Sequence, residues 1–172
     1  MLTENFNVIG SVRLAYTSNN FRNYRFKNIL GDETSPDAYS SGIYYYFQTH
    51  LTMVVGSGNT DPTFQDIHLE TPINNLTVVT QGNDITPVNG TNKYNDFTAF
   101  HLLTHTAVFR NDTNEPITIR EIGLISRTFS QTSDSYKYMI SRDVIDPVII
   151  NPGEQKAFSV SIGNPLTTVS SN

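Results

Sequence analysis

Apolar and polar residues alternate along most of the chain, which is the pattern of half-buried β-strands. The alternation predicts eight strands, over residues 6–16, 21–30, 43–55, 76–80, 97–109, 117–125, 138–144 and 157–162. Polar loops are predicted over 31–41, 56–62 and 81–96, and residues 151–154 carry the Asn-Pro-Gly-Glu sequence of a β-turn. One helical turn with Thr63 as its cap is expected at 63–66.

Short strands separated by turn residues are typical of a two-sheet β-sandwich of jelly-roll or immunoglobulin-like type. We therefore predict a single all-β domain over residues 1–163, followed by a polar tail over 164–172. The aromatic side chains of Tyr44, Tyr45 and Phe47 point to both faces of their strand. Such a strand is covered on both sides, either by two sheets or by a sheet and a neighbouring subunit.

Charged residues make up only 16% of the chain, against about 25% in typical domains, and amides and hydroxyls take their place. An amide-rich surface suits a protein that packs against its own copies, because an amide is easier to dehydrate than a charge. An AT-rich genome would give the same composition. The net charge of −5 argues against a nucleic-acid partner, which requires a clustered basic surface.

The chain has no cysteine, so disulfides and thiolate metal sites are excluded. No stretch approaches the roughly 18 apolar residues of a membrane span, and the first ten residues lack the features of a signal peptide. We expect no membrane partner.

A search for catalytic chemistry gives weak candidates only. His101 and His105 would lie about 13 Å apart on a strand, too far to share a metal, so they and the other two histidines (His50 and His68) are expected to be structural or surface residues. Ser57 lies between Gly56 and Gly58, but no helix follows to build a nucleophile elbow. We predict no catalytic residue, no cofactor and no enzymatic activity.

Loop carboxylates leave two further possibilities. Asp61, Asp66 and Glu70 are weak candidates for a calcium site, although their spacing differs from the EF-hand pattern and turn or cap roles explain them more simply. Loop acids would also be the candidates if the chain were a cell-wall hydrolase: Asp32, Glu33 and Asp37, together with Asp61 and Asp66.

Several motifs, in the same order along the chain, resemble those of small virion structural proteins of tailed bacteriophages. Residues 55–70 resemble the signature V-G-x-G-T-x-x-P-x-x-x-D-x-x-L-E, with Asn59 where Gly or Thr is common. Three shorter stretches follow: 109–113 resembles F-x-N-x-T, 119–124 resembles I-x-E-I-G-L, and 141–144 resembles x-R-D-V. A proline-rich approach to P-x-G over 147–153 completes the similarity, which covers about 43–162.

The resemblance implies a non-enzymatic subunit that assembles as a homo-oligomeric ring or collar at the phage neck or tail. Its partners would be copies of itself and other neck, tail or portal-vertex proteins, and it would be made in the host cytoplasm and reside in the virion. The alternative is a glycan- or receptor-binding module of a tail or fibre, in which Tyr39, Tyr94 and Tyr136 would stack on sugars.

The signature residues also carry physical expectations. Gly56 and Gly58 would adopt positive φ on leaving a strand, and Pro62 would stiffen the crossing. Asp66 and Glu70 are expected to meet a cation such as Arg142 across the sandwich.

Glu121 and Arg142 are expected to pair at the rim of the core, because consecutive strands are usually neighbours. Simple alternation places Glu121 on the face of Ile119, and Arg142 on the face of Tyr138.

Overall fold

The computed structural model describes residues 1–2, 26–34, 51–88, 100–127, 134 and 137–164. Within these ranges it contains eight strands and no α-helix. The strands are β1 (Phe26–Lys27), β2 (Glu33–Thr34), β3 (Leu51–Gly56), β4 (Leu76–Val88), β5 (Phe100–Asn111), β6 (Ile117–Arg127), β7 (Lys137–Ile150) and β8 (Gln155–Asn164). No helix in this described part is long and apolar enough to cross a membrane.

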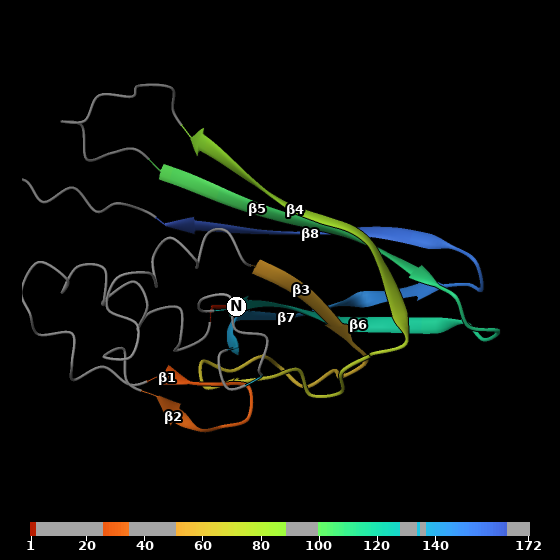
Figure 1. Cartoon of the computed structure of the whole chain (residues 1–172), viewed down its shortest axis with the longest axis horizontal. Helices are drawn as coiled ribbons and strands as arrows, with labels where there is room; N and C mark the ends of the chain where they lie inside the picture. Colours follow the sequence, from red (N-terminus) through yellow and green to blue (C-terminus); the bar gives the residue numbers. More distant parts are fainter. Residues whose placement is uncertain (3–25, 35–50, 89–99, 128–133, 135–136, 165–172) are drawn as a thin grey trace, which may run out of the picture.

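The strands form two three-stranded antiparallel sheets and one small hairpin (Figure 1). The sheet orders are β3-β6-β7 and β4-β5-β8, and β1 pairs with β2. The predicted all-β, sandwich-like fold is therefore confirmed. Residues 3–25, 35–50, 89–99 and 165–172 lie outside the described residues, and with them the predicted strand at 6–16, most of that at 43–55, and Tyr44, Tyr45 and Phe47.

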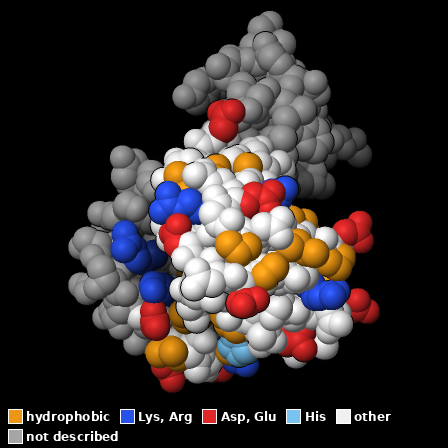
Figure 2. Space-filling model, turned by 90° about the vertical axis from the view of Figure 1, so that its right-hand side faces the viewer, with side chains coloured by type: hydrophobic (Ala, Val, Ile, Leu, Met, Phe, Trp, Pro, Cys, Tyr) orange, Lys and Arg blue, Asp and Glu red, His pale blue; other side chains and the backbone are white. Residues whose placement is uncertain are grey.

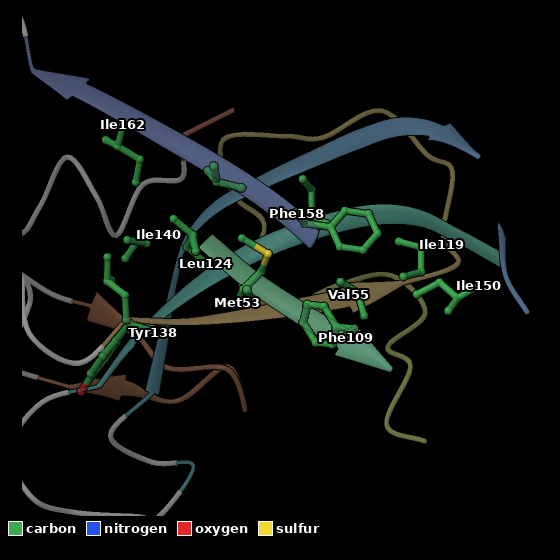
Figure 3. Packing of buried hydrophobic residues seen from close by; sticks show 14 residues of the cluster. Met53, Val55, Phe109, Ile119, Leu124, Tyr138, Ile140, Ile150, Phe158 and Ile162 are labelled. Atoms are coloured by element: carbon green, nitrogen blue, oxygen red, sulfur yellow. The ribbon is translucent and has the colours of Figure 1, made fainter. Parts of the chain in front are cut away.

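The core lies between the two sheets, because its buried side chains come from both (Figure 3). Met53 and Leu124 come from the β3-β6-β7 sheet, while Phe109 and Phe158 come from β5 and β8. The rings of Phe109 and Phe158 meet edge to face, with centroids 6.0 Å apart and planes at 69°. This edge-to-face geometry is favoured between aromatic rings.

Three sequence expectations about the elements were wrong. Residues 81–88 belong to β4 and not to a loop, since pairing with β5 outweighs the poor strand propensity of their Gly, Asn, Asp and Pro residues. Glu33 and Thr34 form β2 inside the predicted 31–41 loop. Thr63 and Asp66 close one turn through a backbone hydrogen bond of 3.3 Å, without a helix. The β-turn at 151–154 is confirmed, with Glu154 N–H donating to Asn151 O at 2.9 Å and Gly153 at φ 77°.

Two irregularities in the β6–β7 ladder change which face each side chain occupies. The register shifts between Leu124 and Ile125, and the β7 partners of these residues are Ser141 and Met139. The extra β7 residue reverses the alternation, so Arg142 lies opposite Gly123 and not on the face of Tyr138.

A second shift, between Ile119 and Glu121, places Ile119 in the core and Glu121 on the other face. Pro147 lies at this irregularity, where a residue without an N–H is tolerated. Both sequence-based face assignments were wrong, because simple alternation cannot anticipate a bulge.

Candidate functional site

A long segment without regular structure, residues 57–75, covers the face of the β3-β6-β7 sheet that points away from the core; we call it the strap (Figure 1). The strap is attached to the end of β3, where Ile73 N–H donates to Val55 O at 2.9 Å and Gly56 forms a bridge with Pro72. Its one fully buried apolar side chain is Leu69, which lies over Gly123 of β6. The sheet is therefore covered on both faces.

Arg142 of β7 projects from the sheet into the strap and is 3% exposed. Its Nε donates to Glu121 Oε2 at 2.8 Å and its Nη1 to Asp66 Oδ2 at 2.9 Å. Its Nη2 donates to the Thr60 carbonyl at 3.1 Å and lies 3.6 Å from Glu70 Oε2. The Arg142 guanidinium therefore connects Glu121 of the sheet to Thr60, Asp66 and Glu70 of the strap.

Glu121 of β6 is completely buried, yet its carboxylate accepts four hydrogen bonds. Besides Arg142, the donors are the backbone N–H groups of Thr71 (2.8 Å), Gly58 (3.1 Å) and Glu70 (3.1 Å). Three of the four donors are strap backbone. A buried carboxylate is tolerated only when it is paired and hydrogen-bonded in this way.

The two strap carboxylates that face Arg142, Asp66 and Glu70, also accept hydrogen bonds from other strap residues. Glu70 Oε2 accepts from the N–H groups of Asn59 and Thr60, both at 2.9 Å, and from the Thr60 hydroxyl at 2.8 Å. Asp66 accepts from Thr63 N–H at 2.8 Å and from its hydroxyl at 2.7 Å. These contacts fold residues 59–70 around Arg142.

All three carboxylates of the cluster remain ionised at neutral pH. Burial of Glu121 acts to raise its pKa, but the N–H groups of Thr71, Glu70 and Gly58 together with Arg142 outweigh burial and lower the pKa. The pKa of Asp66 is also lowered, because Thr63 and Arg142 outweigh its burial. Hydrogen bonds from Thr60 lower the pKa of Glu70. A general acid requires a raised pKa, so these groups are unsuited to that role.

Positions 56 and 58 require glycine because neither has room for a Cβ atom, and not because the backbone has positive φ there. Among the described glycines only Gly31 and Gly153 have positive φ, so the expected positive φ at positions 56 and 58 was wrong. A Cβ on Gly56 would lie 2.3 Å from Glu121 Oε1, and one on Gly58 would lie 2.6 Å from the Glu70 Cβ. The backbone at the end of β3 and the start of the strap approaches Glu121 so closely that a side chain at either position would collide with it.

The predicted pairing of Glu121 with Arg142 is present, as is the meeting of Arg142 with Asp66 and Glu70. Its location differs from the expectation: the cluster is buried under the strap, on the outer face of one sheet, and neither at the core rim nor across the sandwich. Pro62 is half-buried in the strap between Thr60 and Thr63, both of which contact the cluster.

The calcium candidates are not arranged as a metal site. Asp66 and Glu70 face Arg142, and Asp61 is exposed. Within the described ranges no group of three or more His, Asp or Glu side chains is placed to hold a metal.

The remaining candidates are scattered or lie outside the described residues. Ser57 is exposed. Asp32 of the hydrolase candidates accepts a hydrogen bond from the Asn28 side chain at 3.2 Å, in the β1–β2 turn. His105 is buried against Asn83, and burial lowers its pKa, so it is a neutral structural histidine. Candidates outside the described residues are His50, Asp37, Tyr39, Tyr94, Tyr136 and the side chain of His101.

Sequence reasoning missed the role of Asn111, the central residue of the F-x-N-x-T motif. Its fully buried amide donates to Glu115 O at 2.8 Å and to Ile150 O at 2.9 Å, and its Oδ1 accepts from Thr113 N–H at 2.9 Å. Asn111 thereby ties the β5–β6 turn to the end of β7. An Asn two residues before a Thr in a turn is the available sequence signal, since Asn side chains commonly cap their own turns.

Comparisons with models of protein families, with curated proteins and with solved structures find no match to this chain.

Proposed function

We propose that this chain is a non-enzymatic structural subunit of a tailed-phage virion, which assembles with its own copies into a ring or collar at the neck or tail. The observation that carries the proposal is the meeting of the resemblance motifs in one place. The strap signature supplies Gly58, Asp66 and Glu70, the I-x-E-I-G-L motif supplies Glu121, and the x-R-D-V motif supplies Arg142.

The chemistry of the cluster supports a scaffold and not a reaction centre. Its guanidinium contacts three carboxylates, and the buried carboxylate of Glu121 accepts four hydrogen bonds from protein donors. A substrate would have to displace existing hydrogen bonds to reach these groups, and each buried group left without its partner would cost about 1–3 kcal/mol. Motif residues that satisfy one another define a rigid shape, which is what a repeated building block requires.

The proposal is tested by sedimentation velocity on the purified protein and by mass spectrometry of particles from cells that carry its gene. We expect an oligomer in solution and peptides of this chain in the particles at a constant ratio to the major structural proteins. The Arg142→Met variant is expected to be absent from particles, whereas the matched surface variant Arg110→Met is expected to enter them normally. A monomeric protein that is missing from the particles would refute the proposal.

A further inference from the structure

The edge strand β4 differs from the other edges of the two sheets. In β3 and β8 every second side chain is buried, as in a normal half-covered strand: Leu51, Met53 and Val55, and Phe158, Val160 and Ile162. In β4 all eight residues from Thr77 to Asp84 are exposed, on both faces of the strand. Among the described strands β4 pairs only with β5, which leaves the backbone along its other side directed outward.

Natural proteins protect such edges, because a long unpaired strand is a template for pairing with another chain. The β7 edge is covered in part by the chain terminus, since Leu2 bridges to Ser141. The described part of β3 is contacted by the strap, since Ile73 N–H donates to Val55 O and Gly56 bridges to Pro72. β4 has 13 residues, with Asp84 as its only charged side chain, and carries the exposed Val78 and Val79. Its pairing with β5 is irregular at Val79 and regular from Thr80 to Val88. Figure 2 shows hydrophobic side chains gathered at this end of the molecule, where β4 begins (Figure 1).

We propose that β4 is the docking site for a second copy of this chain, whose own β4 pairs with it in antiparallel orientation about a two-fold axis at Gly82. The inference rests on the self-assembly in the proposed function and names the interface. The β4-β5-β8 sheets of two chains would become one six-stranded sheet, a common size for a natural sheet.

The sequence of β4 is self-complementary in this register. A two-fold axis at Gly82 places Thr80 opposite Asp84 of the second copy, so that a hydroxyl donates to a carboxylate, and this pair occurs twice. It places the exposed Gln81 opposite Asn83, with no charge facing a like charge. An axis at Asp84 would oppose two like charges, and an axis at Gln81 would oppose Val78 to Asp84. Gly82 itself has open space around it, with nothing within 4 Å of an added Cβ.

An isologous contact of this kind closes on two chains. A ring built through β4 therefore consists of dimers joined by a second interface, and it contains an even number of subunits.

Disulfide trapping tests the register, because the chain has no cysteine of its own. Directly opposed residues of antiparallel strands have Cα atoms about 4.5–5.5 Å apart, within the range that a disulfide spans. The single variant Gly82→Cys is expected to oxidise to a covalent dimer within minutes under mild oxidant. The matched control is Thr106→Cys, the β5 neighbour of Gly82 on the same sheet face. Two copies of residue 106 would lie about 14 Å apart and should stay unlinked.

A second pair of variants tests the contact between Thr80 and Asp84 of the second copy by adding a charge at position 80, and it does not depend on a disulfide. Thr80→Asp places carboxylates against Asp84 of the second copy and is expected to weaken dimerisation roughly 2- to 30-fold, whereas Thr80→Lys is expected to tighten it by a similar factor. Both variants are at an exposed position, and circular dichroism is the check that each is folded. Sedimentation equilibrium measures the dissociation constants, and the difference should shrink at high salt.

Equal cross-linking of the two cysteine variants, or unchanged association in both Thr80 variants, would overturn the β4 interface. If the protein nevertheless sediments as an oligomer and is found in particles, only this interface is wrong and the structural role stands. If the Gly82→Cys dimer forms but particles lack the chain, the interface is correct and the virion role is wrong.

Discussion

The two sheets of this protein differ in what covers the face that points away from the core. The β3-β6-β7 sheet has the apolar core on one face and the strap on the other, where a buried guanidinium and three carboxylates hold the strap in place. The outer face of the β4-β5-β8 sheet carries small exposed side chains, such as Thr106 and Ser159, whose hydroxyls lie 2.9 Å apart. The first sheet is covered on both faces, whereas the described outer face of the second is exposed and is the one that we propose to extend into a contact between copies. Mutations should therefore have very different costs on the two sheets.

The largest effect is expected from Arg142→Met. Removing the guanidinium leaves Glu121 buried without its cation, which costs about 3–5 kcal/mol when burial is deep. For a chain of this size that corresponds to a fall in Tm of roughly 6–20 °C. The control is Arg110→Met, which breaks an ion pair with Asp112 whose side chains are 40% and 46% exposed. That change should cost about 0–1 kcal/mol, and equal melting shifts in the two variants would contradict the distinction.

Next in size is the alanine substitution at Gly58, the glycine of the strap. Gly58→Ala places a methyl group 2.7 Å from Glu121 Oε1, and overpacking of this kind costs about 1–3 kcal/mol. Gly82→Ala on the open sheet adds the same methyl group into empty space and should change stability by less than about 0.5 kcal/mol. Urea unfolding of both variants measures the contrast. A Gly58→Ala protein as stable as the wild type would mean that Gly58 is not packed closely against Glu121.

Lowering the pH should destabilise the protein through the carboxylates that hold the strap on the β3-β6-β7 sheet. The pKa values of Glu121, Asp66 and Glu70 are lowered in the folded protein, so their stabilising contribution is complete above the unfolded values of about 4 and is lost as pH falls through the lower folded values. The free energy of unfolding, measured in urea from pH 7 downwards, should decline most steeply below about pH 4. In Glu121→Gln the slope should be shallower. An identical slope in this variant would show that Glu121 does not take part in the acid response.

The smallest effect is expected on the open face, from Thr106→Val. The change removes an exposed hydroxyl contact with Ser159 and supplies a residue that strands favour, so stability should stay within about 0.5 kcal/mol of the wild type. Thermal melting measures this directly. A loss of more than 1 kcal/mol would indicate that the outer face is part of the folded core and not a contact surface.

The sequence predicts the fold class and the composition of the cluster better than its location. Glu121 and Arg142 could be paired from sequence because they lie on consecutive strands and each needs a partner. Their faces could not be assigned, since the extra β7 residue near Ile140 and the irregularity around Arg120 both interrupt the alternation. Strand β4 was missed over 81–88 because its pairing with β5 is a long-range contact, and local propensity carries no information about it.

Glu121 and Arg142 act as a buried pair that holds the strap on its sheet, and a double-mutant cycle measures this coupling. The free energies of unfolding of Arg142→Met, Glu121→Leu and the double variant are compared with that of the wild type. Because each single change leaves an uncompensated partner, the double variant should cost about 1–3 kcal/mol less than the sum of the single changes. Additivity within about 0.5 kcal/mol would contradict the claim, since the two charges would then be stabilised independently of each other.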